Sequence, residues 1–157
     1  MIIRKMDYSD KSKVEVFFGK MGGESSAFFN RGRGNEIFTL SFFENKTKNT
    51  EFFIAVEDDE MLGYVFLMSC DTLIPLLGIA VAENHKGEGI GYKLMTYAMD
   101  YAQEQGKGGI MLTTHIANVR GQSLYEKSGF EKIGTHGASG ELFYLKRFTD
   151  KNYISEK

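Results

Sequence analysis

Three glycines at alternate positions form the part of this sequence best suited to chemistry. Gly87, Gly89 and Gly91 follow an apolar run and stand at the start of a segment with helical periodicity. Because every other side chain is missing, this turn can bring its backbone N–H groups close to a ligand. The unpaired N–H groups of a first helical turn and the positive end of the helix dipole favour a negatively charged group, such as a diphosphate. Residues 76–92 therefore predict an anion-binding loop between a strand and a helix.

Two common phosphate-binding loops do not fit these glycines. A P-loop needs a Gly-Lys-Ser/Thr sequence, but Lys93 follows Tyr92 and precedes Leu94. The dinucleotide fingerprint G-x-G-x-x-G needs a glycine at one of the positions that Tyr92 and Leu94 occupy. Nucleotide binding through either pattern is therefore disfavoured.

A second block of polar and aromatic side chains follows at 118–130, where the sequence reads NVRGQSLYEKSGF. Asn118 stands just before a short predicted helix, where an asparagine commonly caps the first turn. Tyr125 comes seven residues later, which is two helical turns, so the two side chains share one face of the helix.

Together the two blocks resemble the GCN5-related N-acetyltransferases, the GNAT family. The family's loop pattern is Arg/Gln-x-x-Gly-x-Gly/Ala, and this chain has Lys86 at the head position, which keeps the positive charge but loses the planar fork of arginine. The family's second pattern is N-x-x-A-x-x-L-Y-x-K-x-G-F, from which the chain departs by having Gly121 in place of the usual alanine. The specific motifs cover residues 76–134.

The resemblance implies that acetyl-CoA is the cosubstrate. The backbone of one strand would bond to the pantetheine arm, the glycine loop would hold the diphosphate, and Asn118 would contact the pantetheine or adenosine portion. The cofactor-binding residues implied in this way are Ile79, Ala80, Val81, Lys86, Gly87, Glu88, Gly89, Ile90, Gly91 and Asn118. An ordinary glycine-rich strand-to-helix connection is the alternative for the loop, and helix capping is a role of Asn118 that can coexist with cofactor binding.

In the family, the tyrosine that corresponds to Tyr125 protonates the departing thiolate. A phenol has an ordinary pKa of about 10, close to that of a thiol, so proton donation is feasible. The alternative is a half-buried tyrosine that packs under Phe130.

The general base is left open by the sequence. Some family members have a glutamate five residues before the motif asparagine, where this chain has Thr113. His115 lies on the same strand face two residues later and has a suitable ordinary pKa of about 6.5, so it is a candidate catalytic residue, although an exposed or structural histidine is the alternative. Asp71, Glu83, Glu24 and a backbone-held water are further candidates. No cluster of cysteines and histidines suggests a metal site.

The composition indicates one globular domain. The chain has 157 residues, of which 42% are hydrophobic and 25% charged. A formal net charge of −2 gives no basic surface for nucleic acid. No apolar run reaches the roughly 18 residues that a membrane span needs. The single cysteine, Cys70, cannot form an internal disulfide, and the N-terminus lacks the apolar run of a signal peptide, so we expect a cytoplasmic protein without a membrane partner.

The elements expected to position these residues make an α/β (α+β) fold. The order is strand, two helices, three strands, helix, strand, helix and two strands, which is also the order of the family. Strands are predicted at 2–6, 51–57, 61–69, 74–82, 110–114, 130–133 and 141–147. Helices are predicted from a cap at Ser9 or Asp10 to Met21, and at 36–45, 89–105 and 118–127. An early hairpin and a later strand–helix alternation predict a mixed sheet of six to seven strands flanked by about four helices, with residues 1–148 as one GNAT-like domain and 149–157 as a polar tail.

The aromatic residues at 28–43 leave three interpretations open. They could fill the core, form a homodimer contact or line the substrate site, and the core or dimer interpretation is favoured because buried aromatic clusters usually have these roles. In the family this region lies over the acceptor site.

Two functions are compatible with the sequence. The first is an acetyltransferase that moves an acetyl group from acetyl-CoA directly to a primary amine of a small molecule or peptide, with Tyr125 as general acid. The second is a sensor or partner subunit that binds acyl-CoA without turnover. The sequence does not identify the amine.

Overall fold

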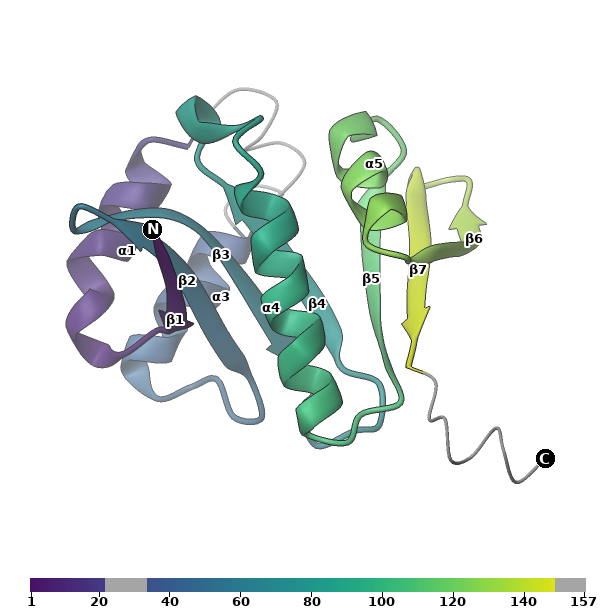
Figure 1. The fold of residues 1–157 in the computed structure, drawn as a ribbon, viewed down its shortest axis with the longest axis horizontal. Coiled ribbons are helices and arrows are strands. Elements are labelled where there is room, and N and C mark those ends of the chain that lie inside the picture. The colour runs from purple at the N-terminus through teal and green to yellow at the C-terminus, as the bar shows by residue number, and fades with distance from the viewer. Residues whose placement is uncertain (22–33, 149–157) are drawn as a thin grey trace.

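The computed structural model describes residues 1–21 and 34–148, which form one seven-stranded sheet with helices on both faces (Figure 1). The strands are β1 Ile2–Lys5, β2 Glu51–Glu57, β3 Glu60–Met68, β4 Leu76–Val81, β5 Gly109–His115, β6 Glu131–His136 and β7 Glu141–Arg147. The helices are α1 Lys11–Gly19, α3 Gly34–Leu40, α4 Ile90–Glu104 and α5 Val119–Lys127, with 3₁₀ turns at Tyr8–Asp10, Ser41–Glu44 and Glu83–His85. The predicted loop at 22–35 lies largely outside the described residues, and so do Glu24, Phe28, Phe29 and the predicted tail at 149–157.

The sheet is mixed, as predicted. Its order is β1-β2-β3-β4-β5-β7-β6, and every neighbouring pair is antiparallel except β4 and β5, which are parallel. The parallel pair requires a crossover, and α4 supplies it. The expected order of elements and the α/β fold class are therefore confirmed.

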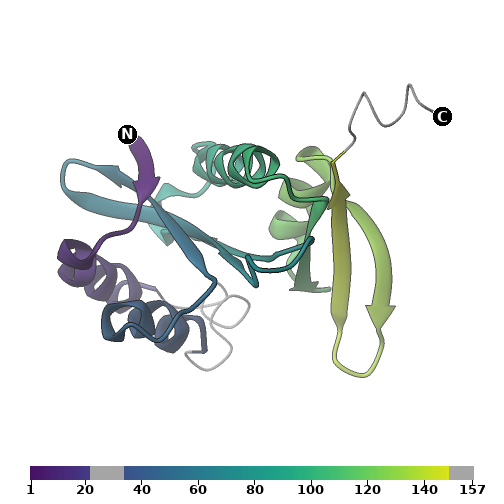
Figure 2. The ribbon, with the colours of Figure 1, turned by 90° about the horizontal axis from the view of Figure 1, so that it is seen from below.

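The helices form two layers, one on each face of the sheet, and each layer packs on its own hydrophobic cluster (Figure 2). Phe53 and Ala55 of β2 belong to the cluster that contains the buried residues of α4 and Tyr125 of α5. Their neighbours Phe52 and Ile54 belong to the cluster of α1, against which α3 packs. Because successive side chains of a strand point to opposite faces, a strand covered on both sides is apolar throughout, which explains the run at 51–57.

The two parallel strands diverge soon after they meet. β3 and β4 pair along the whole of β4, whereas β4 and β5 share one register pair, Leu76 with Met111. The Met111 N–H also donates to the carbonyl of Pro75, which directly precedes β4, at 3.0 Å. Beyond this point the carboxyl ends of β4 and β5 are not paired with each other, so within residues 1–21 and 34–148 no strand pairs with Ile79–Val81 on the β5 side.

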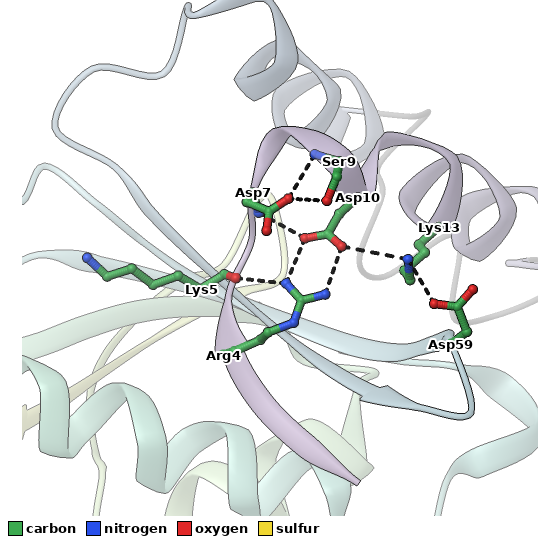
Figure 3. A network of polar contacts seen from close by, with 7 residues as sticks. All are labelled: Arg4, Lys5, Asp7, Ser9, Asp10, Lys13 and Asp59. Atoms are coloured by element: carbon green, nitrogen blue, oxygen red, sulfur yellow. Dashed lines mark hydrogen bonds and ion pairs between the residues drawn. The ribbon is translucent and has the colours of Figure 1, made fainter.

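An ion-pair network holds β1 against the start of α1 (Figure 3). Both oxygens of the buried Asp10 carboxylate accept hydrogen bonds of 2.8 Å from the Arg4 guanidinium. Asp10 Oδ2 also accepts the Asp7 N–H, and the Asp7 side chain caps the 3₁₀ turn by accepting from the Ser9 N–H. Ser9 therefore does not cap the helix, and Asp10 stands at the cap position with its carboxylate used by Arg4 and Asp7. α1 also ends at Gly19, before the predicted end at Met21.

Candidate cofactor site

A cavity of about 430 Å³ lies where the end of β4, the glycine loop and α5 meet. The structure brings into its wall every sequence-predicted cofactor residue except Glu88, together with Tyr125. The end of β4 and the glycine loop, which are adjacent in sequence, and the distant helix α5 thus contribute one wall each. The divergence of β4 from β5 leaves the space for it.

The three glycines of the loop have different structural roles. Gly87 and Gly89 adopt φ angles of 89° and 82°, a left-handed conformation that is costly for other residues. Gly89 is also the N-cap of α4, and no side chain of the cap bonds to the first-turn N–H groups of that helix. At Gly91 a Cβ would lie 3.1 Å from Leu124 Cδ2, so a side chain there would require Leu124 to shift slightly. The loop therefore has the bare backbone and the helix N-terminus that an anion requires.

The charged side chains of the loop pair with one another. Lys86 Nζ lies 3.2 Å from Glu83 Oε2, and the Lys86 side chain is only 15% exposed. His85 Nδ1 lies 3.1 Å from Glu88 Oε2, and of these two residues His85 lines the cavity whereas Glu88 does not. Lys86 can thus offer its charge to an anion while Glu83 holds it in place.

Two further cations on α5 line the cavity, and the sequence analysis did not identify them. Arg120 and Lys127 are on the cavity wall, and Lys127 Nζ lies 4.7 Å from the centre of the Tyr92 ring. Their spacing is the signal that could have found them, because residues 120, 124 and 127 follow helical periodicity on the same short helix as Tyr125. Leu124 lines the cavity between them.

Asn118 and Tyr125 meet through a third side chain, Thr114 of β5. Asn118 Oδ1 accepts the Gly121 N–H at 3.1 Å, and Asn118 Nδ2 donates to Thr114 Oγ1 at 3.0 Å. Burial raises the pKa of the Tyr125 phenol, and a hydrogen bond from the Thr114 side chain opposes that rise. All three side chains are buried, with exposed fractions of 6% or less. Asn118 is therefore an N-cap as well as part of the cavity wall.

Gly121, which replaces the family's usual alanine, explains how the Asn118 side chain reaches this position. A Cβ at residue 121 would lie 2.3 Å from Asn118 Nδ2 and 2.8 Å from its Cγ. The asparagine amide thus occupies the volume that an alanine methyl group would fill. The orientation of the Asn118 side chain therefore depends on glycine at position 121 in this chain.

His115 lies apart from Tyr125. It is next to Thr114 in β5, so its side chain points to the opposite face of the sheet, and it is not on the wall of the cofactor cavity. His115 Nδ1 accepts the Ala117 N–H at 3.0 Å, and the ring packs against Gly140. A nitrogen that accepts a hydrogen bond is unprotonated, so the basic nitrogen of this imidazole is already engaged.

The other candidate bases are in different surroundings. Asp71 is exposed and follows β3, so it lies at the end of β4 away from the cavity. Glu83 pairs with Lys86 and also lines a second cavity of about 280 Å³ between α1, the β2–β3 turn and the end of β4. Among residues 1–21 and 34–148, no group of three or more potential ligands is placed to hold a metal ion. In the same residues no helix has the length and apolar character to cross a membrane.

Comparison with known proteins identifies the family. The sequence profile of the acetyltransferase (GNAT) family matches residues 23–130. The chain belongs to this family. Both GNAT motifs thus lie within the matched region.

Individual relatives agree with this assignment. A streptothricin acetyltransferase from Streptomyces lavendulae is 31% identical over 98 residues, which are 60% of this chain and 52% of that protein. The N-acetyltransferase YhfO of Bacillus subtilis is 27% identical over 141 residues, covering 84% of this chain and 91% of the relative. This GNAT chain therefore matches about half the length of the first relative and most of the second.

Solved structures match over nearly the whole chain. The yncA protein of Salmonella typhimurium, solved with its cofactor acetyl-CoA, superposes with a TM-score of 0.76 at 17% identity, over 95% of this chain and 94% of that one. A GNAT-family acetyltransferase from Streptococcus pneumoniae gives a TM-score of 0.76 at 18% identity, over 94% and 99% of the two chains. At this identity the likeness establishes the fold.

Proposed function

We propose that this protein transfers an acetyl group from acetyl-CoA directly to a primary amine of a small molecule or peptide, with Tyr125 as general acid. The observation that carries the proposal is the single cavity in which the free backbone of β4, the glycine loop and the Tyr125 phenol come together. A thioester held along β4 with its diphosphate on the loop would place its reacting end next to α5. Acetyl-CoA is thus the cosubstrate that fits all three walls.

The cofactor residues divide by the chemistry of the groups they would hold. The backbone of Ile79, Ala80 and Val81 offers donors and acceptors to the amides of pantetheine. The segment from Lys86 to Gly91 offers N–H groups and one ammonium to the diphosphate. Arg120 and Lys127 add positive charge at the same cavity, which suits a ligand with more than one phosphate.

The burial of Tyr125 keeps its phenol in the protonated form that a general acid needs. The raised pKa keeps the phenol protonated at neutral pH, so the proton is available when the thiolate departs. The same lack of water makes the new thiolate more basic, because an anion is poorly stabilised in a dry site. The pKa of the phenol and that of the thiol are thus both raised, so the proton transfer between them remains feasible.

The amine would reach the thioester from the face opposite Tyr125, where His115 lies. Because His115 Nδ1 already accepts the Ala117 N–H, we favour a water molecule as the route by which the amine loses its proton, with His115 as the alternative base. A desolvated amine loses its proton more readily than one in water. Replacing His115 by alanine tests this choice, since activity near that of wild type supports the water and a loss of several hundredfold supports the histidine.

The proposal also covers the domain bounds, the cellular location and the assembly of the protein. Residues 1–148 would form the catalytic domain, residues 149–157 a polar tail, and the protein would act in the cytoplasm without nucleic acid or membrane as partner. A homodimer is the assembly to test first, by light scattering. Streptothricin belongs in any first set of acceptors, because one relative is named for it.

The decisive experiment measures free thiol release from acetyl-CoA over a panel of small amines and peptides. Thermal stabilisation by CoA is measured in parallel. Amine-dependent thiol release supports the enzyme. Stabilisation by CoA without turnover on any amine would instead support the acyl-CoA sensor, and neither response would overturn both functions.

A further inference from the structure

The wall of the cofactor cavity is positively charged, although the protein as a whole is negative. Lys86, Arg120 and Lys127 line the cavity, and its described wall residues include no Asp or Glu. The whole chain has 19 Lys and Arg against 21 Asp and Glu, which gives a formal net charge of −2. Positive charge gathered in one cavity of a negative protein favours a ligand that carries several anionic groups.

The two cations of α5 differ from Lys86 in having no carboxylate partner. Lys86 Nζ shares its charge with Glu83 Oε2 at 3.2 Å. In the part of the chain that the structure describes, no carboxylate forms an ion pair with Arg120 or Lys127. Both side chains are exposed. Their charges are therefore available to a ligand without first breaking an ion pair.

Lys127 is held in place by an aromatic ring. Its Nζ lies 4.7 Å from the centre of the ring of Tyr92, which is 41% exposed and belongs to the first turn of α4. Glu126, the acid next to Lys127 in sequence, accepts a hydrogen bond of 2.9 Å from the Tyr144 hydroxyl. A ring attracts an ammonium ion but does not neutralise its charge. The contact thus holds an available cation of α5 beside the helix that follows the glycine loop.

Arg120 stands at the other end of α5, where its charge is disfavoured. It is the second residue of the helix and lies seven residues before Lys127, which is about 10 Å along the helix axis. A cation in the first turn meets the positive end of the helix dipole, and an anion bound there would offset this cost. Both side chains are long, so their charged ends can meet at one group beside Leu124, which lines the cavity between them.

We propose that Arg120 and Lys127 form a second anion subsite of the cavity, which binds the 3′-phosphate of CoA. This phosphate is a monoester with a charge of about −1.5 to −2 at neutral pH, which suits two unpaired cations. The CoA ribose carries the diphosphate as well, so the two phosphate subsites must be neighbours. The contact of Lys127 with Tyr92, in the helix that the glycine loop opens, meets this requirement.

This inference rests on the proposed function, and it deepens that function by naming the form of the cosubstrate that the site selects. A cavity with this subsite prefers CoA to dephospho-CoA, which lacks only the 3′-phosphate. The diphosphate is the competing group for the two cations. Because both ligands carry the diphosphate, comparing them separates the two assignments.

The test measures the affinity for CoA and for dephospho-CoA by calorimetric titration in low salt. Wild type should bind CoA about twenty- to hundredfold more tightly than dephospho-CoA. Arg120→Gln and Lys127→Gln should each weaken CoA about five- to tenfold, the low end for a charge-assisted hydrogen bond because both groups are exposed, and dephospho-CoA less than about twofold. The double variant should bind the two ligands within about threefold of each other. The preference should shrink in high salt.

Two lysines outside this subsite provide matched controls. Lys86→Ala should weaken CoA and dephospho-CoA by about the same factor, because the glycine loop would face the diphosphate that both ligands carry. Lys93→Gln removes an exposed charge of α4 outside the cavity wall and should leave both affinities unchanged.

Tyr92 is a positioning residue in this arrangement, because it acts through Lys127. Tyr92→Leu removes the ring and should lower the preference for CoA about two- to threefold, whereas Tyr92→Phe retains a ring face for the ammonium group and should keep the preference. A purely structural tyrosine would instead change the melting temperature and weaken both ligands alike. Melting curves of all variants accompany the titrations.

The outcomes separate this subsite from the proposed function. Equal losses for both ligands in the α5 variants, unchanged CoA affinity in these variants, or a wild type that binds both ligands equally would overturn the 3′-phosphate subsite while leaving CoA as the ligand. A wild type with the expected preference that acetylates no amine would support the subsite and overturn only the transfer reaction. A wild type that binds neither ligand would overturn the proposed function and this inference with it.

Discussion

The glycine loop shows at the level of single residues why a cofactor site needs unusual backbone angles. At Gly87 and Gly89 a Cβ would meet open space, so no protein atom forbids a side chain there. The positive φ angles disfavour a side chain at these positions, because the left-handed conformation costs a non-glycine residue about 1–2 kcal/mol. The same open space is where an anion would lie.

Gly89→Val tests both effects. We expect a folded protein with a melting temperature a few degrees lower and with CoA affinity reduced below detection, because the branched side chain is strained and fills the anion's volume. Calorimetric titration with CoA measures the affinity. Gly137→Val is the control, since residue 137 also faces open space, lies in the turn between β6 and β7 and has no positive φ angle. Unchanged CoA affinity in Gly89→Val would show that the anion does not use this loop.

Lys86 should contribute less than the glycines. Lys86→Ala should weaken CoA binding by about 1–2 kcal/mol in low salt, because one charge-assisted hydrogen bond is lost while the loop amides remain. The loss should shrink in high salt, where a partly exposed charge is screened. Lys93→Ala, which removes an exposed lysine of α4 outside the cavity wall, is the matched control. Equal effects of the two variants would mean that Lys86 acts only through overall charge.

At the level of elements, the contact between β1 and α1 depends on a buried carboxylate. Asp10 is fully buried, its partner Arg4 is about one-third exposed, and a second cation, Lys13 Nζ, lies 3.9 Å from Asp10 Oδ1 (Figure 3). The bidentate hydrogen bond with Arg4 lowers the pKa of Asp10 although burial opposes this. A carboxyl group with a lowered pKa in the folded state stabilises the protein above its unfolded pKa, and this stabilisation is lost as pH falls through the folded pKa.

Asp10→Asn should therefore destabilise the protein in a pH-dependent way. At pH 7 we expect a loss of roughly 2–3 kcal/mol, below the full cost of breaking a buried pair because Arg4 is partly solvated. The difference between wild type and variant should narrow below about pH 4 as the wild-type carboxyl group takes up a proton. Urea unfolding at several pH values measures this, with Asp100→Asn on the exposed side of α4 as control. A difference that does not change with pH would contradict the charge-based explanation.

Some elements were easier to predict from the sequence than others. The β4–loop–α4 unit and α5 were predictable because glycine spacing, helical periodicity and the Asn118 cap are local signals. The sequence left the start of α1 open between Ser9 and Asp10, and the structure has Asp10 at the cap position. The pairing of the Asp10 carboxylate with Arg4 was not predictable, because Arg4 belongs to another element. The direction of the His115 ring was equally hidden, because it is set by the turn that brings the Ala117 N–H to it.

At the scale of the whole molecule, the cofactor cavity exists because two strands separate. The sequence marks β4 and β5 as strands, but how far they pair is decided by tertiary contacts that no local pattern contains. Thr114 likewise has no motif that marks it, and only the packing of α5 on β5 brings it to Tyr125. The sequence therefore indicated the two motif blocks, which the structure brings to the wall of one cavity, but not the residues around them.

Ligand binding should stabilise the entire domain. A ligand that binds only the folded state adds about 2.7 kcal/mol when present at 100 times its Kd, which corresponds to a rise in Tm of roughly 5–10 °C for a chain of this size. Thermal melting with CoA measures the shift, and Gly89→Val should show none. Adenosine bisphosphate without the pantetheine arm should give a smaller shift, because it cannot use the β4 backbone. Equal rises in Tm with CoA and with adenosine bisphosphate would show that the β4 backbone does not contribute to binding.

The early separation of β4 from β5 also bears on solubility. Past Leu76, β4 has one row of backbone groups with no neighbouring strand, and such a row at the rim of a sheet is a template for aggregation. Here the row faces the gap that separates β4 from β5 in Figure 1, where the cavity between β4, the glycine loop and α5 lies. A thin, unbranched chain with its own amides, such as the pantetheine arm of the proposed cofactor, would cover this row when bound. The proposed ligand would then also protect an exposed sheet edge from aggregation.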